Sequence, residues 1–324
     1  MLSGRLASGG SRESPAPTWP RLASGVLVGA TMIGIAAAQL PSAILAQTAP
    51  NGPGGATTPG VPTASTGPTG PTGATSPSEP ADPTPCATAS LHLRCPDLVM
   101  SAPYSLHLDR TTIPGRVLMR AASSINNHGS GPLEVEAHRG RSGGMAVYQA
   151  IYDTRGRRNL FRTAAKLVFK YVPGERYEHE SVGNFSYWKF QHAATFELWS
   201  IDAQRRAVQL VRRGPKVDYC LRDLIHSRPS PSSPTAPVYP ACNQNPNARS
   251  DVLGTSVGWA DVYPYEYPEQ WIDVTGLHGQ FAYVEIADPE DLLLESNHRN
   301  NVSETYVTLP SGRVLGHRVG VGAP

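Results

Sequence analysis

The feature that most constrains the fold is a series of short apolar stretches between residues 86 and 310, separated by Gly, Pro, Asn and Asp. Several alternate apolar with polar residues, as Phe281–Ile286 does, and this is the pattern of a strand with one buried face. Long helical periodicity is absent from the sequence, and Ala164–Tyr171 is the best helical candidate. Regularly spaced strands without intervening helices predict an all-β fold, an antiparallel β-sandwich with long loops and little helix. The expected strands are Tyr104–Leu108, Val117–Ala122, Leu133–Ala137, Val147–Tyr152, Thr195–Ile201, Ala207–Val211, Trp271–Val274 and Phe281–Ile286.

The first 46 residues have the composition of an export signal. Arg5, Arg12 and Arg21 precede an apolar run, residues 22–46, that ends on the small residue Ala46, and this order is typical of a secretory signal peptide. The alternative is an uncleaved membrane anchor, because the run approaches the roughly 20 residues that span a bilayer. Proline and glycine within the run favour cleavage. Under either interpretation the rest of the chain lies outside the cytoplasm, secreted or tethered by its N-terminal segment.

Composition divides the remainder of the chain. Residues 47–85 are rich in Pro, Gly and Thr and contain almost no large apolar side chains, so we expect a disordered linker there. Residues 86–312 are long enough for one sizeable core and form the predicted domain, and residues 313–324 are expected to be a C-terminal tail. The formal net charge of +2 is small and gives no indication of a nucleic-acid partner.

All four cysteines, Cys86, Cys95, Cys220 and Cys242, follow the linker. An even number of cysteines in an exported chain indicates disulfides. Three pairings are possible, and the spacing favours Cys86 with Cys95 and Cys220 with Cys242. No Cys-x-x-Cys or Cys/His zinc pattern is present, which argues against a structural zinc.

A set of local matches, in order along the chain, resembles the catalytic domain of the lysyl oxidase family. Asn127–Glu134 and Val147–Asp153 are similar to the opening strands of bacterial lysyl-oxidase-like proteins. Lys216–Asp223 resembles the family pattern Lys-x-x-(Phe/Tyr)-Cys-Leu-x-Asp. The other matching segments are Phe196–Leu198, Gln204–Arg206, Asp261–Tyr263, Gln270–Thr275 and Glu295–Val302. Their order and spacing extend the resemblance over residues 96–305.

The resemblance implies a secreted oxidase of primary amines that depends on copper and on a lysine tyrosylquinone. In the family this quinone is built from a lysine and a tyrosine of the protein itself, through oxidation at the copper. The matching residues here are Lys216, four residues before Cys220, and Tyr263, eight residues before Trp271. The implied substrate is a primary amine, such as a lysine side chain of an extracellular protein. Without that chemistry, Lys216 would be an ordinary surface lysine and Tyr263 a half-buried tyrosine.

The copper motif of the family, His-x-His-x-His, has no counterpart in Val182–Phe190, which contains no histidine. Histidines at alternate positions of a strand would point three imidazoles to one face, a suitable arrangement for Cu(II). The corresponding positions hold Asn184, Ser186 and Trp188 or, in the other register, Phe185, Tyr187 and Lys189. None of these side chains is a good copper ligand. A rearranged copper site would have to use His179, His192, His226 or His298, of which the first two lie nearest in sequence.

Three functions are therefore compared. The first is the exported copper- and quinone-dependent amine oxidase that the resemblance implies. The second is a non-catalytic binding or scaffold domain derived from that family, with an extracellular protein or a cell-envelope polymer as its partner. For such a domain, the basic turn Arg155–Arg158 is a candidate contact with an anionic polymer. The third is a calcium site at Asp261, Asp273 and Asp288, because carboxylate oxygens suit that cation.

Overall fold

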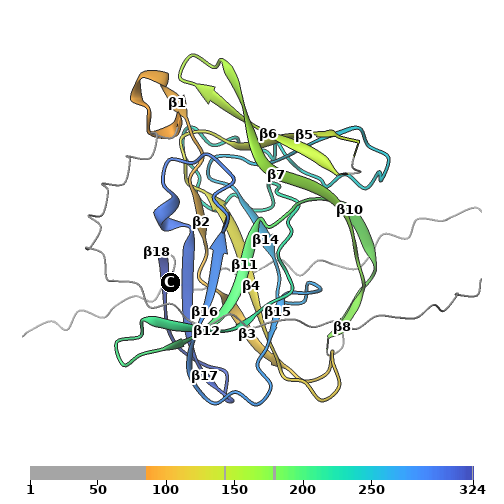
Figure 1. Cartoon of the computed structure of the whole chain (residues 1–324), viewed down its shortest axis with the longest axis vertical. Helices are drawn as coiled ribbons and strands as arrows, with labels where there is room; N and C mark the ends of the chain where they lie inside the picture. Colours follow the sequence, from red (N-terminus) through yellow and green to blue (C-terminus); the bar gives the residue numbers. More distant parts are fainter. Residues whose placement is uncertain (1–84, 142–143, 178–179, 323) are drawn as a thin grey trace, which may run out of the picture. The chain divides into compact units, whose positions relative to one another are not determined.

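Antiparallel strands are the main regular secondary structure of the protein, in a computed structural model that describes residues 85–141, 144–177, 180–322 and 324 (Figure 1). The described residues belong to one unit, Ser76–Pro324. Its helical elements are short 3-10 turns, Pro85–Ala87 (η1), Ala89–Leu91 (η2) and His298–Asn300 (η3). The predicted all-β class is confirmed. The predicted signal peptide and nearly all of the predicted linker lie outside the described residues.

Two five-stranded sheets form the sandwich. In the first sheet the strand order is β12-β11-β16-β17-β18. The second is organised around one long strand, β4, with β14 and β15 pairing along one edge and β2 and β3 along the other. The bounds in the first sheet are Ala194–Ile201 (β11), Ala207–Arg213 (β12), Gly279–Ala287 (β16), Val302–Leu309 (β17) and Arg313–Val321 (β18). The bounds in the second are Leu98–Met100 (β2), Tyr104–Asp109 (β3), Leu118–Asn127 (β4), Ala260–Tyr263 (β14) and Trp271–Asp273 (β15).

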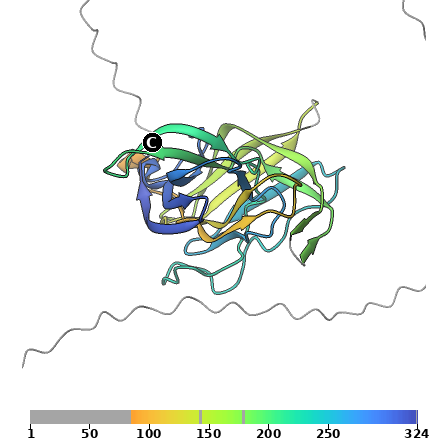
Figure 2. The same cartoon turned by 90° about the horizontal axis from the view of Figure 1, so that it is seen from below.

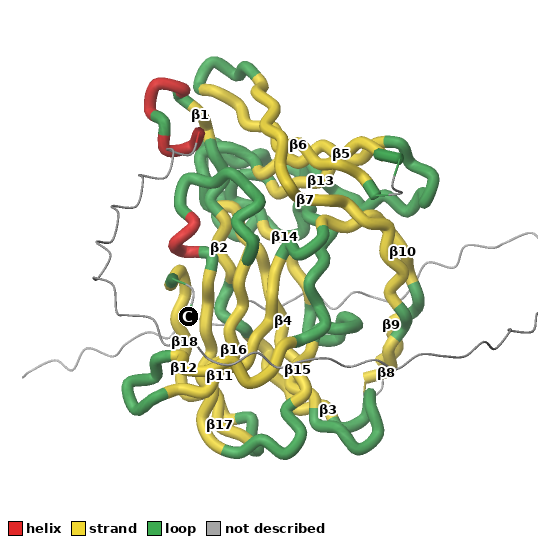
Figure 3. The backbone as a smooth tube through the Cα atoms, in the orientation of Figure 1, coloured by secondary structure: helices red, strands yellow, loops and turns green. Residues whose placement is uncertain are grey.

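A third sheet contains β10-β7-β6-β5-β13, with β1 pairing with β6 (Figure 3). Its strands are Leu93–Arg94 (β1), Leu133–Arg139 (β5), Met145–Asp153 (β6), Arg158–Val172 (β7), Phe185–Phe190 (β10) and Ser250–Thr255 (β13). The long strand β7 pairs with β6 over its first part and with β10 over its last part. The strands Glu175–Tyr177 (β8) and Glu180–Val182 (β9) form a separate hairpin between β7 and β10. This arrangement carries β10 away from β6 along the curved green arm in Figure 1.

The hydrophobic core joins all three sheets. All ten residues of β4 are buried, because β4 has neighbours on both edges and both faces are covered. A single cluster of buried side chains contains Met119 and Ile125 of β4, Leu198 and Tyr283 of the first sheet, and Leu167 of the third. Burial of large apolar side chains contributes about 1.5–3 kcal/mol each, so this shared core is the main source of stability.

All eight strands expected from the sequence are present, with small shifts at their ends. Two expectations are wrong. Ala164–Tyr171, the helical candidate, is part of β7, because backbone pairing with β6 and β10 outweighs the helix propensity of its Ala, Lys and Leu residues. Most of the predicted tail, residues 313–321, is β18, which pairs with β17 at the side that carries the C-terminus (Figure 2). Tail composition alone does not reveal this edge strand, since most of its side chains are exposed.

Both disulfides have the pairing that the spacing favours. Cys86 is joined to Cys95, and Cys220 to Cys242. The second bridge ties the Pro- and Ser-rich segment before β13 to the buried segment around Cys220. Among the described residues no helix is long or apolar enough to cross a membrane.

Candidate functional site

Lys216, the predicted lysine precursor, is buried rather than exposed on the surface. It follows β12 and lies in the loop that leads to Cys220. Its Nζ donates a hydrogen bond to the carbonyl oxygen of Asp218. The same Nζ lies 3.6 Å from the ring centroid of Tyr219 and 4.2 Å from that of Tyr263. The structure therefore brings together the two residues that the sequence analysis singled out.

Tyr263, the predicted tyrosine precursor, is the last residue of β14 and is also buried. Its register partner on β4 is Ser123. Its hydroxyl oxygen accepts a hydrogen bond of 3.2 Å from the backbone N–H of Cys220. Its ring packs edge-on against Tyr219 and Tyr267, at centroid distances of 4.3 and 4.7 Å. Tyr263 is thus held on two sides by aromatic rings and at its hydroxyl by the disulfide-linked segment.

Strand β10 supplies a wall of this site, and its contacts with Tyr267 show which face of the strand looks toward Lys216 and Tyr263. Phe185, Tyr187 and Lys189 all contact Tyr267: the Phe185 ring lies 5.4 Å from the Tyr267 ring, Tyr187 shares a hydrogen bond between the two hydroxyls, and Lys189 Nζ lies 3.3 Å from the Tyr267 hydroxyl. Trp188 points to the other face, where its indole N–H donates to the carbonyl oxygen of Asn245. The sequence allowed two alignments of the copper motif with β10. The side chains that face Tyr267 are those of residues 185, 187 and 189.

Together these side chains form a lysine–tyrosine cluster. Its members are Lys189, Lys216, Tyr187, Tyr219, Tyr263 and Tyr267. The sequence analysis missed Tyr219 and Tyr267. Tyr219 is the aromatic residue of the family pattern that Lys216–Asp223 matches, and Tyr267 lies four residues after Tyr263, so both signals were present in the sequence.

Burial perturbs the titratable groups in and around the lysine–tyrosine cluster. Burial, followed by the charge of Lys189, lowers the pKa of Lys216 well below its usual value. Burial, followed by the charge of Lys170, lowers the pKa of Lys189 to about 8. Asp261, on β14, is close enough to interact with both lysines, and burial raises its pKa to about 8. Neither carboxylate oxygen of Asp261 has a hydrogen-bond partner among the described residues. Burial in this site therefore destabilises the charged forms of both the lysines and Asp261.

The lysine–tyrosine cluster does not fit copper. The inward face of β10 offers a phenyl ring, a phenol and an ammonium group at the three alternating positions, and none of them replaces an imidazole as a Cu(II) ligand. Lys189 is fully buried and directs a cationic group into the same space. A copper ion placed there would meet a like charge in a region of low dielectric constant.

The described histidines do not assemble a replacement copper site. His192 takes up a positive φ of 56°, and its Nδ1 lies 2.5 Å from Glu290 Oε1 at the surface. His226 stacks on Trp259 at 4.8 Å. His298 lies 3.4 Å from a carboxylate oxygen of Glu295. These three histidines are each occupied in a different neighbourhood, and His179 lies outside the described residues.

The proposed calcium ligands also do not meet. Asp273 pairs with Arg116, and Asp288 accepts hydrogen bonds from the backbone N–H groups of Leu292 and Leu293. Within the described ranges, one group of three side chains could hold a metal ion, namely Asp288, Glu295 and His298. It contains neither Asp261 nor Asp273, so the expectation of a shared site for the three aspartates is wrong.

Comparison with known proteins agrees with this geometry. The lysyl oxidase family model matches residues 169–317, which run from β7 to β18 and include every member of the lysine–tyrosine cluster. No curated protein matches the chain. The matched range ends within β18 and so includes only the first residues, 313–317, of the predicted tail. Residues 169–317 therefore match the lysyl oxidase family, and within this range the β-sandwich places Lys216 against Tyr263.

Proposed function

We propose that this protein is an exported, non-catalytic binding domain built on the lysyl oxidase fold, with a lysine in the place of the copper centre. The observation that carries the proposal is the position of Lys189. Its Nζ lies 3.3 Å from the Tyr267 hydroxyl, on the face of β10 where the histidines of the family motif would lie. Because an ammonium group binds no metal and repels one, the described residues on this face of β10 offer no copper centre for the oxidation that builds the quinone.

Two disulfides support the extracytoplasmic part of the proposal. Disulfides form and persist in oxidising compartments, and all four cysteines of the chain are paired. The Cys220–Cys242 bridge also braces the segment whose backbone N–H binds Tyr263. The same compartment would contain the expected partners, an extracellular protein or a cell-envelope polymer.

The second candidate function is oxidation of primary amines, and one observation favours it. Lys216 Nζ and the ring of Tyr263 are only 4.2 Å apart, the proximity that a lysine–tyrosine cross-link requires. This proximity does not supply an oxidant, and the described residues do not supply a copper site. The oxidase is therefore the alternative that the first experiment has to exclude.

The deciding experiment measures copper and a quinone on the exported protein, purified from cells grown with added copper. Wild type is compared with Tyr263→Phe and with Tyr171→Phe, a matched control because Tyr171 is exposed on β7. We expect no bound copper, no visible chromophore and no oxygen uptake with a primary amine in any of the three proteins. About one copper per chain, together with a chromophore that Tyr263→Phe abolishes and Tyr171→Phe retains, would overturn the proposal in favour of the oxidase.

A further inference from the structure

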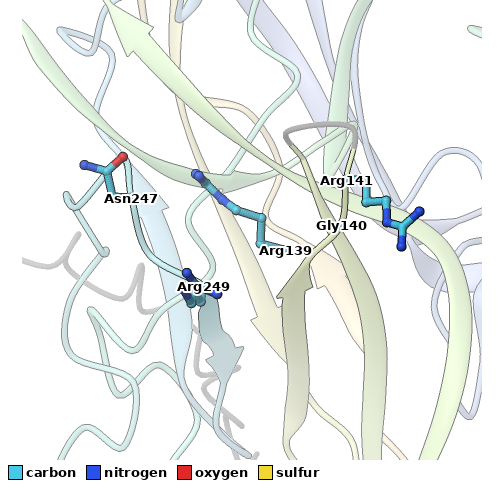
Figure 4. A pocket seen from close by; sticks show the side chains of 5 residues that line it. All are labelled: Arg139, Gly140, Arg141, Asn247 and Arg249. Carbon is cyan, nitrogen blue, oxygen red and sulfur yellow. The ribbon is translucent and has the colours of Figure 1, made fainter.

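A basic hollow of about 540 Å³ lies where β5 ends and β13 begins (Figure 4). Its lining consists of Arg139, Gly140, Arg141, Asn247 and Arg249. Trp188 connects it to β10, because the Arg139 guanidinium lies 5.2 Å from the Trp188 ring centroid. Three arginine residues thus line one cavity, and among the described residues no Asp or Glu lines it.

These arginines are not neutralised within the protein. Among the described residues, Arg139, Arg141 and Arg249 form no ion pair with Asp or Glu. Asp251, two residues beyond Arg249, instead accepts hydrogen bonds from Asn243 and from the backbone of Val252. An uncompensated cluster of guanidinium groups attracts anions and presents paired N–H donors to carboxylate or phosphate oxygens.

The predicted basic turn Arg155–Arg158 is different, although it carries the same number of arginines. Arg157 pairs with Asp153, and Arg158 pairs with both Glu134 and Glu136. Two of its three arginines are therefore already satisfied. The hollow beside β13 is the stronger candidate for an anionic ligand.

The walls of the hollow are held in place by hydrogen bonds. Arg139 donates its backbone N–H to the carbonyl oxygen of Arg249 at 2.8 Å, which joins the end of β5 to the start of β13. Its side chain also donates to the carbonyl oxygen of Pro246. In the opposite wall, the side-chain oxygen of Asn245 accepts the backbone N–H of Asn247 at 2.9 Å and fixes a tight turn. The site is thus preformed, and binding need not order these backbone segments.

The arginines are spread over the cavity rather than focused on one point. Figure 4 shows the Arg139 side chain extending toward the segment that carries Asn247. The Arg141 side chain points away from Arg139 and Asn247. A single small anion would contact only part of this set. A linear ligand with repeated negative charges would satisfy successive arginines along its length. Aromatic side chains, on which the bases of a single-stranded nucleic acid would stack, do not line the hollow.

We propose that this hollow binds a linear anionic polymer of the cell envelope or extracellular matrix, one whose repeating units carry carboxylate or phosphate groups. This proposal names the ligand of the proposed binding domain, and its biological meaning rests on that proposed function. The two proposals are tested separately, since polymer binding does not depend on copper content. Failure of one measurement therefore leaves the other interpretable.

The test measures affinity of the exported protein for two polymers, polygalacturonate and poly(glycerol phosphate), at low and at physiological salt. Arg141→Gln with Arg249→Gln removes two exposed guanidinium groups without disturbing Arg139, whose side chain braces Pro246 and Trp188. The matched control, Arg212→Gln with Arg313→Gln, removes the same charge from exposed positions of the first sheet. Single-stranded DNA of equal charge is the third ligand.

We expect the hollow variant to bind at least one of the two polymers ~10-fold or more weakly than wild type at low salt, and the control variant to stay within about twofold. Loss on polygalacturonate alone would assign a carboxylate ligand, and loss on poly(glycerol phosphate) alone would assign a phosphate ligand. Absence of binding to both polymers, equal losses in the two variants, or binding to DNA alone would overturn the proposal.

Discussion

Replacement of Lys189 by methionine tests whether the buried lysine lowers the free energy of unfolding. Lys189 is fully buried, and its closest polar contact is the Tyr267 hydroxyl at 3.3 Å. Tyr267 keeps a second partner, the hydroxyl of Tyr187, when Lys189 is removed. Methionine has a similar length and no charge, so it fills the same space without the desolvation penalty. We therefore expect Lys189→Met to stabilise the protein at neutral pH.

The magnitude follows from the pKa of Lys189. Burial lowers this pKa from 10.5 to about 8, a difference that corresponds to about 3 kcal/mol of lost stability while the lysine is protonated. Loss of one hydrogen bond and of the contact with the Tyr187 ring offsets about 1 kcal/mol of the gain. The expected net increase in the free energy of unfolding is about 2 kcal/mol at pH 7, or about 4–8 °C in Tm for a domain of this size.

The sign of the pH dependence is also fixed. Below pH 8 both folded and unfolded states hold the Lys189 proton, and the cost is fully present. Between pH 8 and 10.5 the unfolded state binds a proton that the folded state has released, so wild-type stability rises with pH. The advantage of Lys189→Met should therefore shrink across this window and vanish above it.

Urea unfolding at pH 7, 9 and 10.5 measures the effect, with Lys166→Met as the matched control. Lys166 is exposed on β7, so its replacement should change stability by no more than about 0.5 kcal/mol at any of these pH values. All four cysteines are disulfide-bonded, so no free thiol is present to reshuffle the bridges at high pH. A Lys189→Met protein that is less stable than wild type at pH 7, with an unchanged difference at pH 10.5, would refute the reasoning.

Two further predictions address the copper position and Tyr263. The triple change Phe185→His, Tyr187→His and Lys189→His places three imidazoles on the face of β10 that meets Tyr267. We expect this variant to bind about one copper per chain, as measured by metal analysis. A folded variant without copper would contradict the assignment of that face. Tyr263→Phe leaves the buried backbone N–H of Cys220 without its acceptor and should lower the free energy of unfolding by about 1–3 kcal/mol; unchanged stability would show that this hydrogen bond contributes nothing.

The strand pattern predicted most of the sandwich because the strands are short apolar stretches, several of them alternating, between Gly, Pro, Asn and Asp. The third sheet was only partly predictable. β7 contains the segment Ala164–Tyr171, whose composition suits a helix, and only its pairing with β6 and β10 makes it a strand. Such pairing involves residues that are distant in sequence, so local propensity cannot report it. The short strand β14 was found only as the family match Asp261–Tyr263, because four residues are too few to show a period.

The family resemblance predicted part of the candidate site. The pattern of residues alone, without the resemblance, did not predict it. Lys216 and Tyr263 were identified, and the structure places them in contact. Their burial was not foreseen, because a lone lysine between a proline and a valine has the pattern of a surface residue. The choice between the two registers of β10 also required the structure. It depends on which side of the strand meets Tyr267, a residue nearly 80 positions away in the sequence.

The strongest argument for an oxidase is that Lys216 and Tyr263 stand together, and each has a structural role that needs no quinone. The Tyr263 hydroxyl satisfies a buried backbone N–H next to the Cys220–Cys242 bridge. Lys216 donates to the carbonyl oxygen of Asp218 and covers the faces of two tyrosine rings. Removal of either side chain would leave a buried polar group unpaired or a cavity, each of which costs about 1–3 kcal/mol or more. Packing is therefore enough to explain their proximity, whereas the ammonium of Lys189 cannot serve as a Cu(II) ligand on the face of β10 where we propose that the histidines of the family would lie.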